Sequence, residues 1–311
     1  MARVRKKAAA PPEAVVEEPV AIAPEPEPEP ELGKPEDDRV GEPAWARGGI
    51  YEPLYGSGIT RVLAIAGREV GSFLVSPIGW VITPIVILVV SWFGYLTPVI
   101  IGNQASMESV FGLVAFLLIL PIVPLTTMRV LAEERRQGTL EMLLTSPVRD
   151  WELVVGKWLG SLAFFGLMFS FTLVFVVLFL VYLPHVTVHL FGVALTFGDV
   201  DFGLLLSGYL GLLALGASFI AVGVLCSSIT QNQIVAAFLT FGALLILYYC
   251  GTASQFLAQP YAGFFDYLGA SNRYQGFSQG QIALKDAVYF LSLTFGALFL
   301  ATRVLESRRW R

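Results

Sequence analysis

Between Gly203 and Ser227 the chain reads GLLLSGYLGLLALGASFIAVGVLCS, without a single Asp, Glu, Lys or Arg. A helix needs about 20 mostly apolar residues to cross the hydrocarbon core of a bilayer, so this stretch predicts a membrane-spanning helix. Its small residues, among them Gly208, Gly211 and Gly216, let helix backbones approach closely within a bilayer. We therefore expect this span to pack tightly against its neighbours in preference to lining a pathway.

Five further stretches pass the same length criterion. The chain is 55% hydrophobic and 14% charged, whereas a soluble domain carries about 25% charged residues. The sequence therefore predicts an all-α integral membrane protein with six transmembrane helices. None of the six spans contains an ionisable Asp, Glu, Lys or Arg, which argues against an ion-coupled carrier. The five further spans are Pro77–Ile101, Val110–Met128, Trp158–Leu183, Ile234–Phe256 and Ala287–Thr302.

The distribution of the 20 Lys and Arg residues predicts the orientation in the membrane. Positive residues near the ends of spans stay on the cytoplasmic side. Nine precede the first span, five lie in or beside the second connection and four follow the sixth span, while Arg273 and Lys285 alone fall in an odd-numbered connection. We therefore expect both termini and the second connection to be cytoplasmic.

The N-terminal segment, residues 1–48, differs in composition from the rest of the chain. It holds eleven acidic and seven basic residues and includes the run PEPEPEPE from Pro24 to Glu31. A segment with so few large apolar residues cannot offset the entropy cost of ordering its chain. We predict a disordered, acidic cytoplasmic tail at 1–48 and a six-helix transmembrane domain at 49–311.

Before the first span, residues Ile59 to Leu74 place apolar side chains at helical spacing, with Arg61 and Arg68 elsewhere. This pattern predicts an amphipathic interfacial helix. The alternative is a helical extension of the first span, but Pro77 favours a break, since a proline restricts the residue before it.

The second connection reads EERRQGTLEMLLTSPVRDWELVVGKW, from Glu133 to Trp158, and mixes charged with apolar residues. Its glycine, threonine, serine and proline predict a short helix between two hinges, because such residues end and cap helices. One face of that helix suits lipid or the span ends and the other a protein partner; a solvated loop is the alternative. The candidate docking residues are Glu133, Glu134, Arg135, Arg136, Gly138, Thr139, Glu141, Leu143, Leu144, Ser146 and Pro147.

This connection resembles that of ABC-2 type permeases, in which an acidic-basic run precedes Gly-Thr, an acidic residue, paired Leu or Met, Ser/Thr-Pro and a Gly-Lys that enters the next span. Glu133 to Lys157 follows that pattern. The stretches Asp201–Phe219, Cys226–Phe238 and Phe277–Trp310 are similar to the gliding-motility-type branch of the family.

The resemblance implies an export-type permease of the bacterial cytoplasmic (inner) membrane. Its partners would be ABC ATP-binding subunits, a second copy or a related permease, the lipid bilayer and an auxiliary membrane-anchored extracytoplasmic protein. The second connection would be the coupling helix that docks on the ATPase. Nucleic acid is not among the expected partners.

The chain lacks the phosphate-binding pattern GxxxxGK[ST]. Its only Gly-Lys pairs are Gly33-Lys34 and Gly156-Lys157, neither followed by Ser or Thr. Since that pattern cradles nucleotide phosphates, we expect no catalytic, cofactor or metal residue in this chain, and ATP with Mg²⁺ in a partner ATPase. An alternative function is a non-transporting anchor or scaffold of a motility or envelope complex.

Overall fold

The structure is a computed structural model, which describes residues 58–100, 107–138, 149–182, 185–190, 193–198, 202–256 and 261–309. The predicted acidic tail, residues 1–48, lies outside the described residues. Residues 50–311 form one compact unit, which contains all the described residues.

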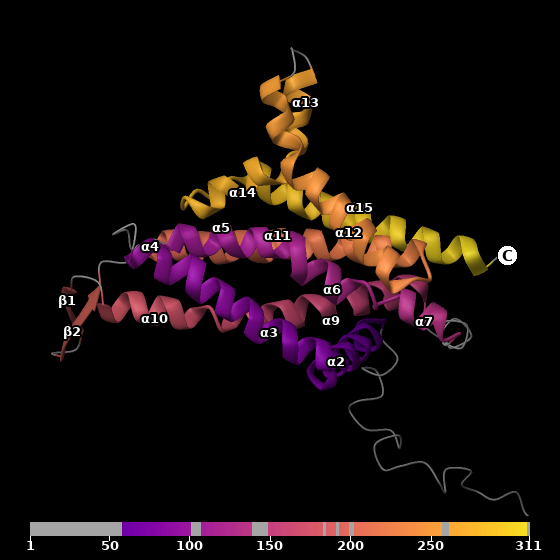
Figure 1. The fold of residues 1–311 in the computed structure, drawn as a ribbon, viewed down its shortest axis with the longest axis horizontal. Helices are drawn as coiled ribbons and strands as arrows, with labels where there is room; N and C mark the ends of the chain where they lie inside the picture. Colours follow the sequence, from indigo (N-terminus) through magenta and orange to yellow (C-terminus); the bar gives the residue numbers. More distant parts are fainter. Residues whose placement is uncertain are drawn as a thin grey trace, which may run out of the picture. The chain divides into compact units, whose positions relative to one another are not determined.

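Six helices are long and apolar enough to cross a membrane, which confirms the predicted fold class. Several of these spans are interrupted and carry more than one label in Figure 1. In chain order, the spans are α3 (Pro77–Val89) with η1 (Val90–Leu96) and α4 (Thr97–Ile100); α5 (Met107–Leu117) with η2 (Leu118–Ile122) and α6 (Val123–Thr127); α9 (Asp150–Ser170) with α10 (Leu173–Tyr182); α11 (Phe202–Ile229); α12 (Gln233–Tyr249) with η3 (Cys250–Phe256); and α15 (Leu284–Arg309).

The third and sixth spans extend well beyond their predicted bounds. The third begins at Asp150 instead of Trp158, and the sixth continues to Arg309 instead of ending at Thr302. The prediction stopped at the first charged residue, whereas the helices continue past it. At the start of α9 the charged side chains are buried in the protein, so the helix does not expose them to lipid.

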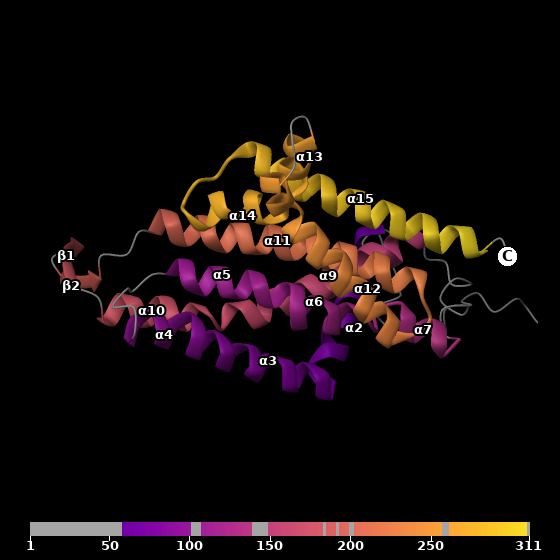
Figure 2. The same cartoon turned by 45° about the horizontal axis from the view of Figure 1, so that its top comes forward.

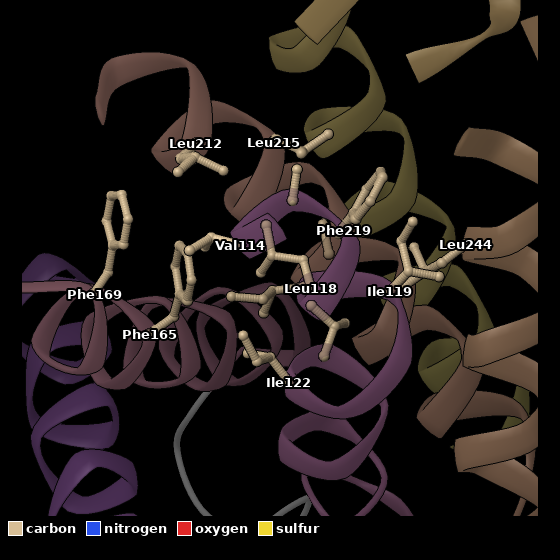
Figure 3. Close-up of a cluster of buried hydrophobic side chains, with 14 of the residues drawn as sticks. Val114, Leu118, Ile119, Ile122, Phe165, Phe169, Leu212, Leu215, Phe219 and Leu244 are labelled. Carbon is tan, nitrogen blue, oxygen red and sulfur yellow. The ribbon is translucent and has the colours of Figure 1, made fainter. Parts of the chain in front are cut away.

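The helix α11 lies at the centre of the bundle, as both ribbon views show (Figures 1 and 2). Its side chains Leu212, Leu215 and Phe219 are fully buried. Figure 3 shows them meeting Leu118 of η2 and Phe165 of α9 in one hydrophobic cluster. Burial of this apolar surface inside the protein positions α5, α9 and α12 around α11.

The predicted tight packing of α11 is present at three of its glycines. A Cβ atom added at Gly208 would lie 2.1 Å from Phe111, and one added at Gly216 would lie 2.5 Å from Phe165. At Gly211 the nearest atom, Cβ of Phe277, would be 2.4 Å away. These spaces are filled by aromatic rings of neighbouring elements, so small residues here allow the helices to approach closely.

The first two spans contain π-helical turns, η1 and η2. Pro121 lies within η2, and a proline removes one backbone donor and displaces the helix around it. The turn η1 packs against α5, where Gly94 approaches Val110. Such turns widen a helix locally and are frequent at functional sites.

Besides α2 (Gly58–Val75) and α7 (Ala132–Arg136), three described features lie outside the spans. They are a two-stranded antiparallel hairpin of β1 (His185–Leu190) and β2 (Val193–Gly198), which pairs His185 with Gly198, and the short helices α13 (Tyr261–Leu268) and α14 (Ala270–Ser278). The hairpin lies at the end of the bundle remote from α7, whereas α13 projects from the side of the bundle near its middle (Figures 1 and 2). The hairpin was not predicted, because a run of about 20 apolar residues indicates a span and carries no signal for a short strand.

Candidate functional site

The predicted interfacial helix is present as α2 (Gly58–Val75) and is separate from the first span. A bend at Ser76 divides it from α3. The helix packs against α9, where Gly156 approaches Ile65 and Gly160 approaches Glu69. Both ribbon views show α2 at the same end of the bundle as α7 (Figures 1 and 2). The charged second connection therefore meets α2 and the start of the third span.

Arg129, after the second span, fixes the junction of α2 and α3. Its guanidinium donates to Oγ of Ser76 at 2.6 Å and to Oγ of Ser72 at 3.0 Å. It also lies over the ring of Phe73, 4.8 Å from the centroid. Phe73 in turn stacks on Phe164 of α9 at 4.8 Å. Sequence reasoning counted Arg129 only as a positive-inside residue and missed this role.

The helix α7 begins against α11. Oγ of Ser227 accepts from the backbone N–H of Leu131 at 3.2 Å and of Ala132 at 3.1 Å. The first N–H groups of a helix have no partner within it, so Ser227 supplies a cap from another element. The helix ends at Arg136, and Gly138, two residues beyond it, has a φ of +71°. This is the position where the sequence predicted a helix end, and a glycine adopts that conformation without strain.

Lys157 joins three helices at this junction. Its Nζ lies 2.8 Å from Oε1 of Glu134 on α7 and 3.3 Å from Oε2 of Glu69 on α2. The Lys157 side chain is 4% exposed, and those of Glu69 and Glu134 are 14% and 20% exposed. A buried charge is tolerated when it is paired and hydrogen-bonded, which explains a lysine inside the third span.

A second charged contact lies at the start of α9. Oε2 of Glu152 accepts from the backbone N–H of Arg149 at 3.0 Å and lies 3.7 Å from the guanidinium of Arg61 on α2. Glu152 therefore caps α9 and holds α2 beside it. We call Arg129, Glu134, Lys157 and Ser227, with their contacts on α2, the junction cluster.

The structure describes five of the eleven candidate docking residues. Glu134 faces inward to Lys157, Glu133 and Arg135 are half-buried, and Arg136 and Gly138 are exposed at the end of α7. Thr139, Glu141, Leu143, Leu144, Ser146 and Pro147 lie outside the described residues. The helix start predicted at Ser146 and Pro147 is therefore not described, and the next described helix begins at Asp150.

The junction cluster holds structural elements together and presents no catalytic arrangement. Among the described residues, no group of three or more His, Cys, Asp or Glu side chains could hold a metal ion. The cluster connects α7 to α2, α9 and α11 through charge-assisted and capping hydrogen bonds. The start of the second connection is therefore bonded to three helices of the domain.

The chain matches the model of a family described as "ABC-2 family transporter protein" over residues 63–294. The match covers more than half of the chain, from within α2 to within α15. It includes the whole junction cluster. None of the curated proteins compared with the chain matches it.

Proposed function

We propose, from the premise that the chain belongs to the ABC-2 transporter family, that it is the permease subunit of an export complex driven by ABC ATP-binding subunits. The family is the membrane component of ABC transporters and is not itself an ATPase. In this proposal ATP and Mg²⁺ bind in the partner subunits. This chain receives their movement through the second connection and passes it to the spans.

The observation that carries the proposal is the pair of contacts, with Glu69 and Glu134, through which Lys157 joins three helices. A coupling element must transmit displacement without absorbing it, and α7 is tied by Lys157 to α2 and α9 and by Ser227 to α11. Rigid elements that move as bodies are the usual means by which such transitions propagate. Closure of the ATP-binding subunits then moves residues Glu133 to Lys157 and rocks the spans between inward and outward access.

Orientation and location belong to the same proposal. With Arg129 and Lys157 at the α7 end, the positive-inside rule places that end and both termini in the cytoplasm. The membrane is the bacterial inner membrane. The gliding-motility-type branch and an auxiliary extracytoplasmic protein are supported by the sequence motifs at Cys226–Phe238 and Phe277–Trp310.

A second permease, identical or related, completes the proposed complex. The first and fifth spans are the least buried of the six within this chain. On α12 the large side chains Ile234, Phe238 and Ile246 are 66 to 72% exposed. In a bilayer such a face meets either lipid or another helix. Two permease copies on two ATP-binding subunits give each coupling segment one docking groove.

The test of docking uses Leu143→Asp and Leu144→Asp in the full chain, purified with its ATP-binding subunit. A carboxylate placed in an apolar docking groove is costly, so we expect loss of co-purification and a fall of about ten-fold or more in stimulated ATP turnover. The matched control is Ile282→Asp, which changes an exposed apolar residue in the connection before α15. It leaves both quantities at the level of the unchanged protein.

Unchanged association and turnover in both leucine variants would remove the docking role. Association without ATP-dependent movement of any solute into vesicles would instead favour a scaffold that performs mechanical work on a partner. The two readouts therefore separate coupling from transport.

A further inference from the structure

An apolar groove lies at the angle between α2 and the first span. It has a volume of about 290 Å³ and is formed by the end of α2, the first turns of α3 and the second half of the third span. On α3 it is lined by Trp80, Thr83 and Ile87, and on the third span by Phe164 and Phe171. Nothing in the proposed coupling mechanism uses this space.

The groove is elongated along the two spans. Its lining residues on α3 follow at intervals of three or four from Trp80 to Ile87, and those on the third span do the same from Phe164 to Phe171. Such residues share one face of a helix, and a helix rises about 1.5 Å per residue, so the groove runs for about 10 Å along the spans. It therefore leads from the predicted interfacial helix α2 into the hydrocarbon core.

The polar side chains beside the groove are already bonded within the protein. Nε1 of Trp80 donates to the carbonyl oxygen of Leu74 at 2.6 Å. Oγ1 of Thr83 donates to the carbonyl oxygen of Gly79 at 2.9 Å. The other lining side chains contain no oxygen or nitrogen. A polar ligand would lose its hydrogen bonds to water here and gain none from these side chains, so the groove suits a hydrocarbon chain.

A positive charge lies beside this apolar space. The guanidinium of Arg129 is 4.8 Å from the ring centroid of Phe73, which lines the groove. Its hydrogen bonds go to neutral oxygens, of Ser72 and Ser76, and the contact with Ser72 is exposed. None of the ion pairs found in the described part of the chain includes Arg129. An arginine with only neutral partners keeps its full charge and has donors left for an anion.

Arg68 adds a second positive charge on α2. It is exposed and lies four residues before Ser72, so it shares a helix face with the serine to which Arg129 is bonded. The neighbouring carboxylate of Glu69 is paired with Lys157. Arginine binds phosphate through charge-assisted hydrogen bonds. Two such cations above an apolar groove match the two parts of a phospholipid.

We propose that the groove holds one acyl chain of an anionic phospholipid from the leaflet that borders α2, with the lipid phosphate at Arg68 and Arg129. The apolar lining binds the chain and the two arginines select the headgroup. Because Arg129 also fixes the junction of α2 and α3, the bound lipid stabilises the angle between these helices. The lipid is a resident ligand and not the transported molecule, so the proposal goes beyond the function proposed above.

The test uses the indole of Trp80 as a probe, because it lines the groove and is 73% exposed. The full chain is placed in phosphatidylcholine nanodiscs that contain a small fraction of lipid with dibrominated acyl chains, either phosphatidylglycerol or phosphatidylcholine. Bromine quenches indole fluorescence on contact, and subtracting the signal of Trp80→Phe removes the other tryptophans. We expect brominated phosphatidylglycerol to quench Trp80 at a mole fraction at least about five-fold lower than brominated phosphatidylcholine, the effect of one arginine near an anionic lipid.

Two variants test the headgroup and the chain separately. Arg68→Gln should lower the preference for phosphatidylglycerol about five-fold. Its matched control is Arg136→Gln, at an exposed arginine of α7. Thr83→Phe fills the groove and should abolish the preference. Its matched control is Thr302→Phe on α15, at a half-buried threonine whose Oγ1 likewise donates four residues back, to the carbonyl oxygen of Leu298 at 2.9 Å. Both controls should keep the preference of the unchanged chain.

Equal quenching by the two brominated lipids in the unchanged chain would mean unselective contact with bulk lipid and would overturn the proposal. So would a preference for phosphatidylglycerol that survives either Arg68→Gln or Thr83→Phe. If neither lipid quenches Trp80, protein such as a second copy of the chain covers the groove, and the proposal is wrong. The ATP-binding subunit is absent from this assay, so its outcome and that of the docking experiment are independent.

Discussion

The two ends of the bundle use polar residues in opposite ways. At the α7 end, Lys157 lies 2.8 Å from Glu134 and 3.3 Å from Glu69, and the paired charges close the gaps between helices. In the other half of the bundle, Arg273 of α14 pairs with Asp286, and polar side chains of α5, α12 and α14 surround a pocket of about 460 Å³. The first end is therefore closed by paired charges, whereas the second leaves a cavity among polar side chains.

The largest expected effect follows from removing the charge of Lys157. Lys157→Met leaves two mostly buried carboxylates without their partner, so the free energy of unfolding should fall by about 2–3 kcal/mol. The thermal midpoint in detergent measures the loss. Because α7 then loses its tie to α2 and α9, the ATP turnover stimulated by the full chain should fall as well.

The control for Lys157→Met is Arg303→Ala on α15. Its pair with Glu306 is 2.6 Å long but exposed, and exposed pairs contribute about 0–1 kcal/mol. A further variant combines Lys157→Met with Glu69→Gln and Glu134→Gln and should regain part of the stability. Equal thermal midpoints for Lys157→Met and the unchanged chain would show that the contacts of Lys157 do not hold the junction.

A smaller effect is expected at the other end. Arg273→Met leaves the buried carboxylate of Asp286 without its cation and removes the contact with the ring of Tyr267. The free energy of unfolding should fall by about 1–2 kcal/mol. Association with the ATP-binding subunit should stay unchanged. If association fell as strongly as with Lys157→Met, the two ends would not be functionally separate.

The spans and the separate helix α2 could be predicted, because both follow from the order of apolar, charged and proline residues along the chain. Six apolar runs and the proline at Pro77 were sufficient for the spans and for a separate α2. The charged residues of the second connection were found by their density, but their partners were not, because the contact of Lys157 with Glu69 joins residues far apart in the chain. The roles of Arg129 and Ser227 were missed for the same reason.

The pocket around Tyr274 was beyond the reach of sequence reasoning. Its residues come from three helices and individually are common in membrane-interface segments. In the sequence, the connection after the fifth span shows only a mixture of aromatic and polar residues, which carries no information on ligand chemistry. Only the packing of α14 on α11, through Ser207 and Gly211, brings the tyrosine beside Glu108.

The smallest predicted effect concerns the end of α7. Gly138 has a φ of +71°, and an added Cβ would meet none of the described residues within 4 Å, so Gly138→Ala tests backbone conformation without a clash with them. A left-handed conformation costs a non-glycine residue about 1 kcal/mol. The matched control is Gly67→Ala on α2, a helical position with open space, where alanine should be neutral or slightly stabilising. If the turn at Gly138 sets the direction in which the connection leaves α7, Gly138→Ala lowers stimulated ATP turnover more than it lowers the thermal midpoint. Equal effects of Gly138→Ala and Gly67→Ala on both quantities would show that this turn is not part of the coupling path.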